Sequence, residues 1–351
     1  SAMTETLSAS VSLGQNITFV RPTYFIIGGF IGIPNINGFS NIPHITYFLI
    51  FLCFAYIMTV VGNVFLMSVI YLVKTLHTPK YMIVFNLALA DLCGSTALTP
   101  KLFETFLFDR TDIVYEDCLS YMFFVYLFID VQSWTLVIMA YDRFIAICFP
   151  LRYHSIVTKP AIAAMLLLVW VVLLSITACT VGLFDRHSFC GSLVIQSFFC
   201  DMGMMLYLAC DDISLIIKIT LVSFVLNPCL PAILIILTYI CIAIALSRIA
   251  SRKERLKAAK TCTSHLILVA VYFIPLLYIN LISDVDVDRD GKIICEVLPH
   301  IVPPLLNPIL YSLKTQEVLN CIKRLCNNML SNISMSKKVF TAMLTKWKVL
   351  K

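Results

Sequence analysis

Seven long apolar segments, each bounded by polar or charged residues, dominate the pattern of hydrophobic positions along the chain. They cover roughly 46–73, 81–107, 116–149, 160–184, 213–247, 262–283 and 294–313. Each reaches the length of about 20 residues that an α-helix needs to cross a bilayer. Prolines inside several segments fit this interpretation, because neighbouring membrane helices can satisfy the carbonyl groups that a kink frees. The pattern therefore predicts an all-α membrane protein, a seven-transmembrane helix bundle over residues 46–313.

Composition supports a bilayer as the solvent for these segments. Hydrophobic residues make up 60% of the 351 residues and charged residues only 13%, whereas soluble domains carry about 25% charged residues. No internal repeat is visible, which argues against a transporter or channel. Catalytic signatures such as His-Glu-x-x-His or a convergent hydrolytic triad are also absent from the sequence, so we expect no enzyme activity.

Lysine and arginine are distributed unevenly between the loops. They concentrate after the first, third, fifth and seventh segments, whereas aspartate and glutamate gather in the other loops. The positive-inside rule then predicts an extracellular N-terminus, residues 1–45, and a cytoplasmic tail, residues 314–351. The net charge of +6 is thus a signal of topology and not of nucleic-acid binding. On this topology Asn16 lies in an extracellular glycosylation sequon, Asn16-Ile17-Thr18.

An Asp-Arg pair ends the third segment. Asp142 and Arg143 are adjacent and can neutralise each other at the membrane boundary. Arg143 can then release this partner and contact another surface when the helices move. A simple interfacial anchor is the alternative, although ionisable residues in membrane segments are usually functional.

Further motifs follow in a fixed order at or near the ends of the segments. They are Gly62-Asn63, Leu76 to Tyr81, Leu87 to Asp91, Met139 to Tyr153, Lys257 to His265, and Pro303 to Tyr311. Together they resemble the rhodopsin-like G-protein-coupled receptors over the whole chain, and within them the odorant (olfactory) receptors. Pro303-Pro304 and Leu313-Lys314-Thr315 resemble the fish-like branch that detects water-borne odorants.

The resemblance implies a plasma-membrane receptor that binds a small extracellular odorant in its helix bundle. It implies coupling to a stimulatory, olfactory-type heterotrimeric G protein, with cAMP as the signal, in cilia of olfactory sensory neurons. A rhodopsin-like receptor for a non-odorant small ligand, such as an amine, is the alternative. Light sensing is excluded because the seventh segment lacks a lysine for a Schiff base.

The resemblance also implies roles for individual polar residues. Arg143 is expected to contact the G protein in the active state, which Tyr239 and Tyr311 would stabilise. A polar relay near the middle of the membrane is expected from Asn63, Asp91 and Asn307, with a helix-packing hydrogen bond as the alternative for Asp91. Many relatives hold sodium there, but Gln132 stands where odorant receptors commonly carry Glu, so we expect no metal at the relay. No cofactor is expected either.

Four cysteines lie in the predicted extracellular loops or at their borders, where disulfides can form. Spacing alone leaves three pairings open, and free thiols are a further possibility. The resemblance implies a bond between Cys118 and Cys200, and then a second bond between Cys190 and Cys210.

The ligand pocket should lie between helices and be mostly apolar. Tyr126 and Asp130 are four residues apart and share a helix face. Asp130 is either the counter-ion of an amine ligand or a partner in an interhelical hydrogen bond. Because Asp284 stands where carboxylate-sensing relatives often carry Arg, a carboxylate ligand is less expected. By position relative to Arg143, Pro231, Pro275 and Asn307, the pocket residues are Val125, Tyr126, Ile129, Asp130, Ser223, Asn227, Phe273, Leu277, Asn280 and His300.

Beyond Tyr311, residues 315–326 read as a short amphipathic eighth helix lying on the membrane. Cys321 and Cys326 in this segment are candidate palmitoylation sites.

Overall fold

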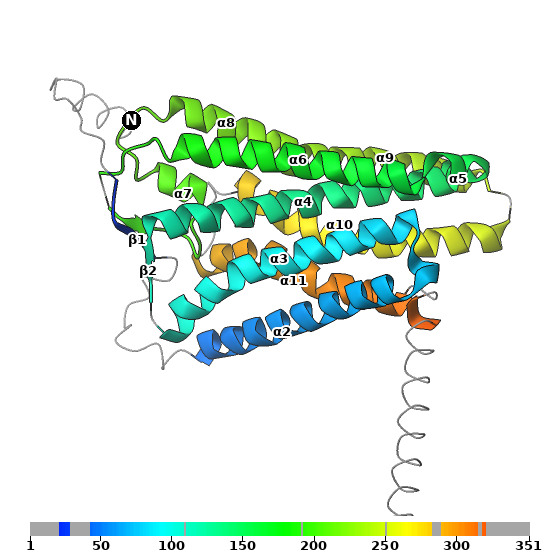
Figure 1. Ribbon diagram of the computed structural model, residues 1–351, viewed down its shortest axis with the longest axis horizontal. Helices are drawn as coiled ribbons and strands as arrows, with labels where there is room; N and C mark the ends of the chain where they lie inside the picture. Colours follow the sequence, from blue (N-terminus) through cyan, green and yellow to red (C-terminus); the bar gives the residue numbers. More distant parts are fainter. Residues whose placement is uncertain are drawn as a thin grey trace, which may run out of the picture.

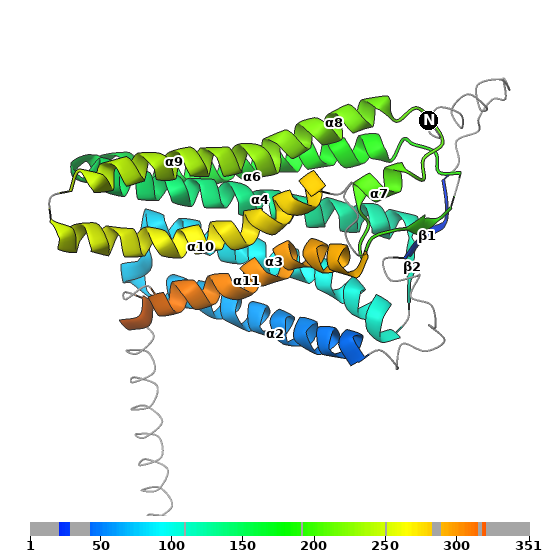
Figure 2. The ribbon, with the colours of Figure 1, turned by 180° about the vertical axis from the view of Figure 1, so that it is seen from behind.

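A computed structural model of the chain describes residues 21–28, 43–108, 110–190, 192–249, 251–282, 289–314 and 318–320. Long helices lie side by side in an elongated bundle (Figure 1), and the view from behind shows the same arrangement (Figure 2). They are α2 (Pro43–Leu72), α3 (Pro79–Phe108), α4 (Tyr115–Cys148), α6 (Lys159–Phe184), α8 (Ser214–Phe224) with α9 (Leu230–Ser247), α10 (Arg252–Ile282) and α11 (Arg289–Lys314). A π-helical turn, η4 (Val225–Cys229), joins α8 to α9.

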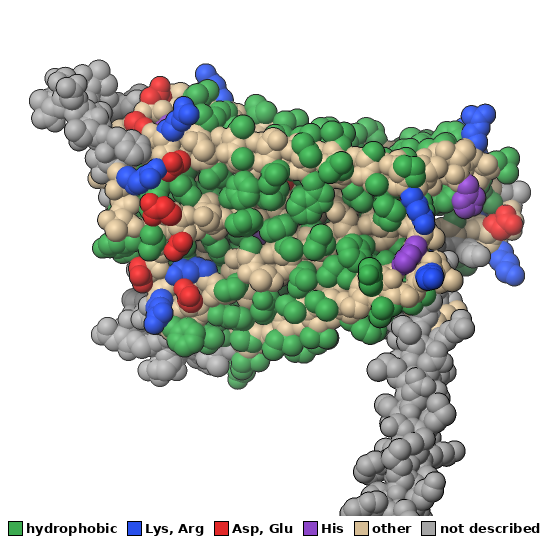
Figure 3. All heavy atoms as spheres, viewed as in Figure 1, with side chains coloured by type: hydrophobic (Ala, Val, Ile, Leu, Met, Phe, Trp, Pro, Cys, Tyr) green, Lys and Arg blue, Asp and Glu red, His purple; other side chains and the backbone are tan. Residues whose placement is uncertain are grey.

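Among the described residues, five spans are long and apolar enough to cross a membrane, and α10 is a sixth if its two halves, bent by 41°, count as one. The last helix, α11, contributes the shorter apolar stretch Val297–Tyr311 and contains four prolines. Hydrophobic side chains cover the middle of the face seen in Figure 3, with most charged side chains at the two ends. The predicted seven-helix fold is thus confirmed.

The largest difference in helix boundaries concerns α10. The apolar pattern predicts its start near residue 262, but the helix begins at Arg252. Its first turns carry exposed charged residues such as Arg252 and Lys253, which a search for apolar residues cannot recognise as helix. The sixth helix therefore extends well beyond its apolar part, into the basic stretch 248–260 that the sequence predicts to continue the fifth and sixth helices.

A small sheet closes one end of the bundle, and no pattern in the sequence predicts it. Strand β1 (Tyr24–Ile27) is the central strand, pairing antiparallel with β2 (Asp112–Val114) and parallel with β3 (Val194–Ile195). Phe25 of β1 is fully buried and packs against the ring of Phe189, with centroids 5.4 Å apart. We call this the sheet end, and the opposite end the Arg143 end.

Short helices and 3-10 turns lie in the loops. At the Arg143 end, the 3-10 turn η2 (Lys74–Leu76) lies between α2 and α3, and the 3-10 turn η3 (Pro150–Arg152) leads into α5 (Tyr153–Ile156). At the sheet end, α7 (Met202–Leu206) follows β3. Of the predicted eighth helix, the structure describes only the helical residues 318–320, with Val318 buried beside α2 and α3. Cys321, Cys326 and the sequon at Asn16 lie outside the described residues, as do Asp284 and the side chain of Asn280.

Candidate ligand and coupling sites

Two disulfides fix the long loop between α6 and α8 over the sheet end of the bundle. Cys118, in the first turns of α4, is bonded to Cys200, and Cys190 is bonded to Cys210 within the loop. These are the two pairings that the resemblance implies. The first bond ties the loop directly to α4, just above the predicted pocket residues of that helix.

The loop places two aromatic side chains into the bundle. Phe198 and Phe199 are buried in one cluster with Val125 of α4 and Ile301 of α11. The Phe199 ring lies 5.8 Å from the ring of His300 and 6.3 Å from that of Tyr126, between centroids. Three predicted pocket residues, Val125, Tyr126 and His300, therefore lie directly beneath this loop.

Asp201 connects the loop to Tyr126. One carboxylate oxygen, Oδ1, accepts the Met204 N–H at 2.8 Å and so caps the start of α7. The other, Oδ2, accepts the Tyr126 hydroxyl at 2.9 Å. The sequence did not single out Asp201, although its place next to Cys200 is a signal that could have found it.

Deeper in the bundle, Asp130 faces the π-helical turn η4. The Asn227 side-chain amide donates to Asp130 Oδ2 at 2.8 Å, and the Asn227 main-chain carbonyl accepts the Ser133 hydroxyl at 3.0 Å. The Tyr272 hydroxyl of α10 donates to the carbonyl of Ile129 at 2.7 Å. The structure therefore joins α4, η4 and α10 at the level of Asp130.

The remaining predicted pocket residues lie on α8 and α10. Phe273 is buried and Leu277 packs beside it in a cluster that also includes Ile129. Ser223 is partly buried near the end of α8, just before η4 begins at Val225. Asn280 is not described at the side-chain level, so its place in the pocket stays a prediction.

The predicted relay is partly assembled. The Asn307 amide donates to Asp91 Oδ2 at 2.7 Å, whereas Asn63 donates to the carbonyls of Thr59 and Pro304, at 2.9 and 3.0 Å. All three residues are buried, and each has one side-chain oxygen without a hydrogen-bond partner. The relay links α3 to α11 directly, while Asn63 links α2 to the α11 backbone.

The residue beside the relay does not supply a negative charge. Gln132 is buried, and its amide nitrogen lies 3.4 Å from the carbonyl of Ala90. Within the described part of the chain, no group of three or more His, Cys, Asp or Glu side chains could hold a metal ion. The expectation that the relay holds no metal stays a prediction.

At the Arg143 end, Asp142 has two partners. The Arg143 guanidinium lies 3.7 Å from Asp142 Oδ2, and the Tyr153 hydroxyl of α5 donates to Oδ1 at 2.7 Å. Burial raises the pKa of the Tyr153 phenol, and the hydrogen bond to Asp142 raises it further. Tyr153 therefore keeps its proton and holds α5 against α4 while Arg143 stays paired.

Tyr239 and Tyr311 lie near Arg143 but are bonded to other groups. The Tyr239 hydroxyl shares a hydrogen bond of 2.7 Å with Nδ1 of His265, and the Tyr311 hydroxyl donates to the Met139 sulfur at 3.3 Å. Both tyrosines interact electrostatically with Arg143. His265 ends one of the quoted sequence motifs, but nothing in the sequence indicates that it pairs with Tyr239.

The comparisons with known proteins agree in one family. The olfactory receptor family model matches residues 52–329. Olfactory receptor 8G17 of Mus musculus is 35% identical over 280 residues, which cover 79% of this chain and 90% of the relative. Olfactory receptor 1 of Rattus norvegicus is 34% identical over 270 residues, 77% and 86% of the two chains. Olfactory receptor 1E1 of Homo sapiens is 34% identical over 278 residues, which cover 78% of this chain and 88% of the relative. The finer resemblance to a fish-like branch stays a prediction.

Proposed function

Because this chain belongs to the olfactory receptor family, we propose that it binds a small extracellular odorant between its helices and activates a stimulatory-type heterotrimeric G protein. The plasma membrane of olfactory cilia is the proposed location, and cAMP is the proposed signal. The proposal rests chiefly on one observation: the Cys118–Cys200 bond fixes Phe199 and Asp201 against Tyr126, so the loop covers the predicted pocket.

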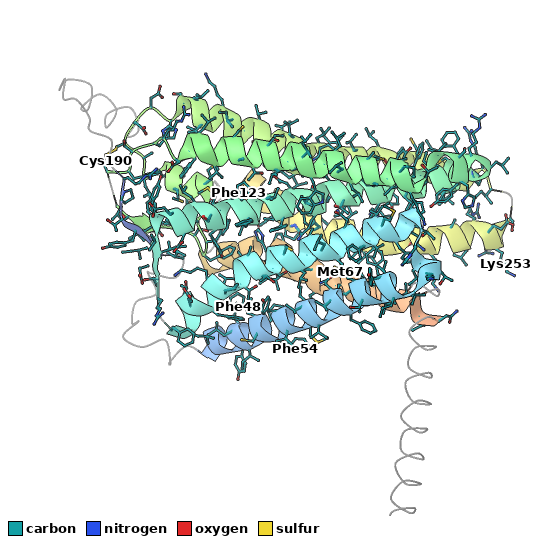
Figure 4. All side chains as sticks on the ribbon, in the orientation of Figure 1. Phe48, Phe54, Met67, Phe123, Cys190 and Lys253 are labelled. Carbon is teal, nitrogen blue, oxygen red and sulfur yellow. A yellow bond between two sulfur atoms is a disulfide. The ribbon has the colours of Figure 1, made fainter. Side chains whose placement is uncertain are left out.

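The proposed orientation places the sheet end outside the cell. Disulfides persist in extracellular compartments, and both disulfides lie at this end of the bundle. Basic loops favour the cytoplasm, and the other end carries exposed Arg152, Lys159 and Arg252. Figure 4 places Cys190 and Lys253 at opposite ends of the bundle.

The proposed ligand site lies below Phe198 and Phe199, among the pocket residues of α4, η4, α10 and α11. Apolar walls come from Val125, Ile129 and Phe273, and polar groups come from Tyr126 and Asp130. A few placed polar groups in an apolar pocket are the usual means of fixing a small ligand's orientation. The chemistry of the walls thus suits a compact, mostly apolar odorant.

The proposed signal depends on a change of partner at Arg143. In the described state Arg143 is paired with Asp142, which we assign to the resting receptor. An odorant shifts the balance only if it binds the active state more tightly than the resting one. In the proposed active state α10 swings outward, Arg143 leaves Asp142, and a G-protein helix enters between the helices.

A further contact with the G protein is proposed for Leu151 in η3. Its side chain is fully exposed and belongs to the same end of the bundle as Asp142 and Arg143. An exposed apolar side chain gains free energy when an apolar depression on a partner removes it from water. The sequence did not single it out because one leucine in a loop carries no periodic signal.

Expression of the chain together with a stimulatory G-protein α-subunit tests this function. A panel of alcohols, amines, acids and steroids is applied, and cAMP is measured with and without ligand. We expect Arg143→Ala to abolish the ligand-driven rise, whereas Lys159→Ala, an exposed charge at the same end, leaves it unchanged. An Arg143→Ala receptor that reaches the surface and signals normally would contradict the proposal.

The orientation has its own test. A tag at the N-terminus should be labelled by antibody on intact cells, whereas a tag inserted beside Lys253 should be labelled only after permeabilisation. The reverse pattern would place Arg143 outside the cell and exclude G-protein coupling there.

A further inference from the structure

Asp130 carries a carboxylate near the middle of a membrane helix, and this carboxylate accepts one identified hydrogen bond. It lies well inside α4 (Tyr115–Cys148) and accepts a hydrogen bond from the Asn227 amide at 2.8 Å. None of the ion pairs among the described residues involves Asp130. An ionised carboxylate can accept about four hydrogen bonds, and an unpaired charge at this depth is costly. Asp130 therefore has acceptor capacity that the structure does not use.

Asn227 supplies a second unused acceptor at the same place. Its side chain is buried, its Nδ2 is committed to Asp130, and its Oδ1 has no hydrogen-bond partner. Since only the NH2 group can donate to a carboxylate, the contact with Asp130 also fixes which way the amide points. The unpartnered Oδ1 is thus a consequence of the Asp130 contact.

Local backbone geometry holds this pair in position. Asn227 lies in η4, where five residues form a π-helical turn ahead of Pro231, with Pro228 inside it. Such turns often occur at functional sites. The Ser133 hydroxyl donates to the Asn227 carbonyl at 3.0 Å, one turn beyond Asp130 on α4. Two contacts between α4 and η4 therefore fix the relative positions of Asp130 and Asn227.

The pair lies in the bundle interior, next to the proposed odorant site. Asp130 interacts electrostatically with Tyr126 on its own helix and with Tyr272 on α10. Tyr126 shares the helix face of Asp130 one turn closer to the loop. Asp130 itself is partly buried and not closed off entirely. A ligand group that enters beneath the loop would reach Asp130 after passing Tyr126.

From this arrangement we propose that Asp130 and Asn227 bind the protonated amino group of the ligand, so that this receptor detects amines. An ammonium group brings a positive charge for the carboxylate and further N–H donors, one of which suits Asn227 Oδ1. An alcohol brings a single O–H donor and no charge, and a carboxylic acid brings a repelled negative charge. The inference rests on the proposed odorant site and adds the chemical class of its ligand.

Three sets of compounds with shared skeletons provide the probes: cyclohexylamine, cyclohexanol and cyclohexanecarboxylic acid; benzylamine, benzyl alcohol and benzoic acid; isoamylamine, isoamyl alcohol and isovaleric acid. Each is applied to the full chain expressed with the stimulatory G protein, and cAMP is recorded against surface expression. We expect at least one amine to activate the receptor more potently than the alcohol and the acid of its set.

The variants separate recognition from structure. Asp130→Asn keeps the size of the side chain and can still hydrogen-bond Asn227, so a structural role would survive it. We expect it to raise the amine concentration for half-maximal response at least about 30-fold, as the loss of a buried charge partner does. The exchanged pair, Asp130→Asn with Asn227→Asp, returns a carboxylate to the site and should restore much of the amine response. Glu104→Gln, which neutralises an exposed acid at the end of α3, is the matched control.

Each outcome decides the inference. Silence of all three amines overturns it, whether or not other compounds act. An amine response that survives Asp130→Asn at unchanged potency also overturns it and leaves the Asp130–Asn227 contact a helix-packing hydrogen bond. The proposed function fails separately, through cAMP signalling that does not depend on Arg143. An alcohol response that requires Arg143 would retain the function while rejecting amine recognition.

Discussion

The hydroxyl of Tyr239 and Nδ1 of His265 share a hydrogen bond of 2.7 Å, and their rings stack with centroids 5.7 Å apart and planes at 19°. This contact ties α9 to α10 beside Arg143. His265 is buried and interacts electrostatically with Arg143. A movement of α10 would therefore carry His265 and the Tyr239 phenol together relative to Arg143.

Replacement of Tyr239 by Phe tests this coupling. The variant keeps the ring stacking but leaves Nδ1 of His265 without the Tyr239 hydroxyl. It also removes the hydroxyl that we propose stabilises Arg143 after it leaves Asp142. Since one hydrogen bond contributes about 1 kcal/mol, we expect agonist potency to fall roughly fivefold to tenfold. Concentration–response curves for cAMP measure the change, and Tyr278→Phe, an exposed tyrosine on α10, is the control. A rise in ligand-free cAMP would instead show that the contact stabilises the resting state.

Neutralisation of Asp142 should have the opposite effect on resting activity. In Asp142→Asn the side-chain oxygen can still accept the Tyr153 hydroxyl, so α5 stays docked, while the ionic partner of Arg143 is lost. Arg143 is then free to contact the G protein, and we expect ligand-free cAMP to rise severalfold. Measurements on Tyr153→Phe separate the loss of α5 docking from the loss of charge. Unchanged basal cAMP in Asp142→Asn would show that the ion pair does not restrain Arg143.

The apolar pattern predicted the helices well because a bilayer requires long, continuous runs of apolar residues. Where helices leave the apolar region, this requirement disappears, which is why the apolar pattern alone starts the sixth segment near residue 262 although α10 begins at Arg252. The sheet was missed for another reason. Its strands have two to four residues, and β1 pairs with strands far away in the sequence, so no local pattern marks them.

The site residues show a similar division. Motif positions predicted Asp130 and Asn227 as pocket residues, but their hydrogen bond joins residues 97 positions apart and depends on how α4 packs against η4. Tyr153 begins the short helix α5 and Asp201 caps the short helix α7, and position alone assigns neither of them a role. Their partners, Tyr126 and Asp142, are on helices and were identified. For the contacts of Asp201 and Tyr153, the sequence thus located one member and packing supplied the other. For Asp130 and Asn227 it located both members but not their contact.

Removal of the Asp201 side chain should loosen the loop over the pocket. In Asp201→Ala the Tyr126 hydroxyl and the N–H of Met204 both lose their acceptor. Each buried polar group left unpaired costs about 1–3 kcal/mol, so we expect a lower melting temperature of the purified receptor and faster ligand release. Asp212→Ala is the control, because Asp212 is an exposed acid of the same loop whose hydrogen bonds go to Ser214 and not to a pocket residue. Equal effects of the two variants would argue against a special role for Asp201.

Close packing of α2 on α11 gives a final prediction, at Gly62 beside the relay residue Asn63. A Cβ atom at Gly62 would lie 2.9 Å from Pro308 Cγ and 3.1 Å from its Cβ, and the rigid proline ring cannot turn aside. Gly62→Ala should therefore push α2 from α11, strain the Asn63 contact with the Pro304 carbonyl, and destabilise the receptor by about 1–3 kcal/mol. Thermal melting and surface expression measure this loss against Gly182→Ala, where a Cβ would meet no atom within 4 Å. If both alanine variants behave like the parent chain, the two helices lie farther apart than the structure places them, and the relay could not link α2 to α11 as described.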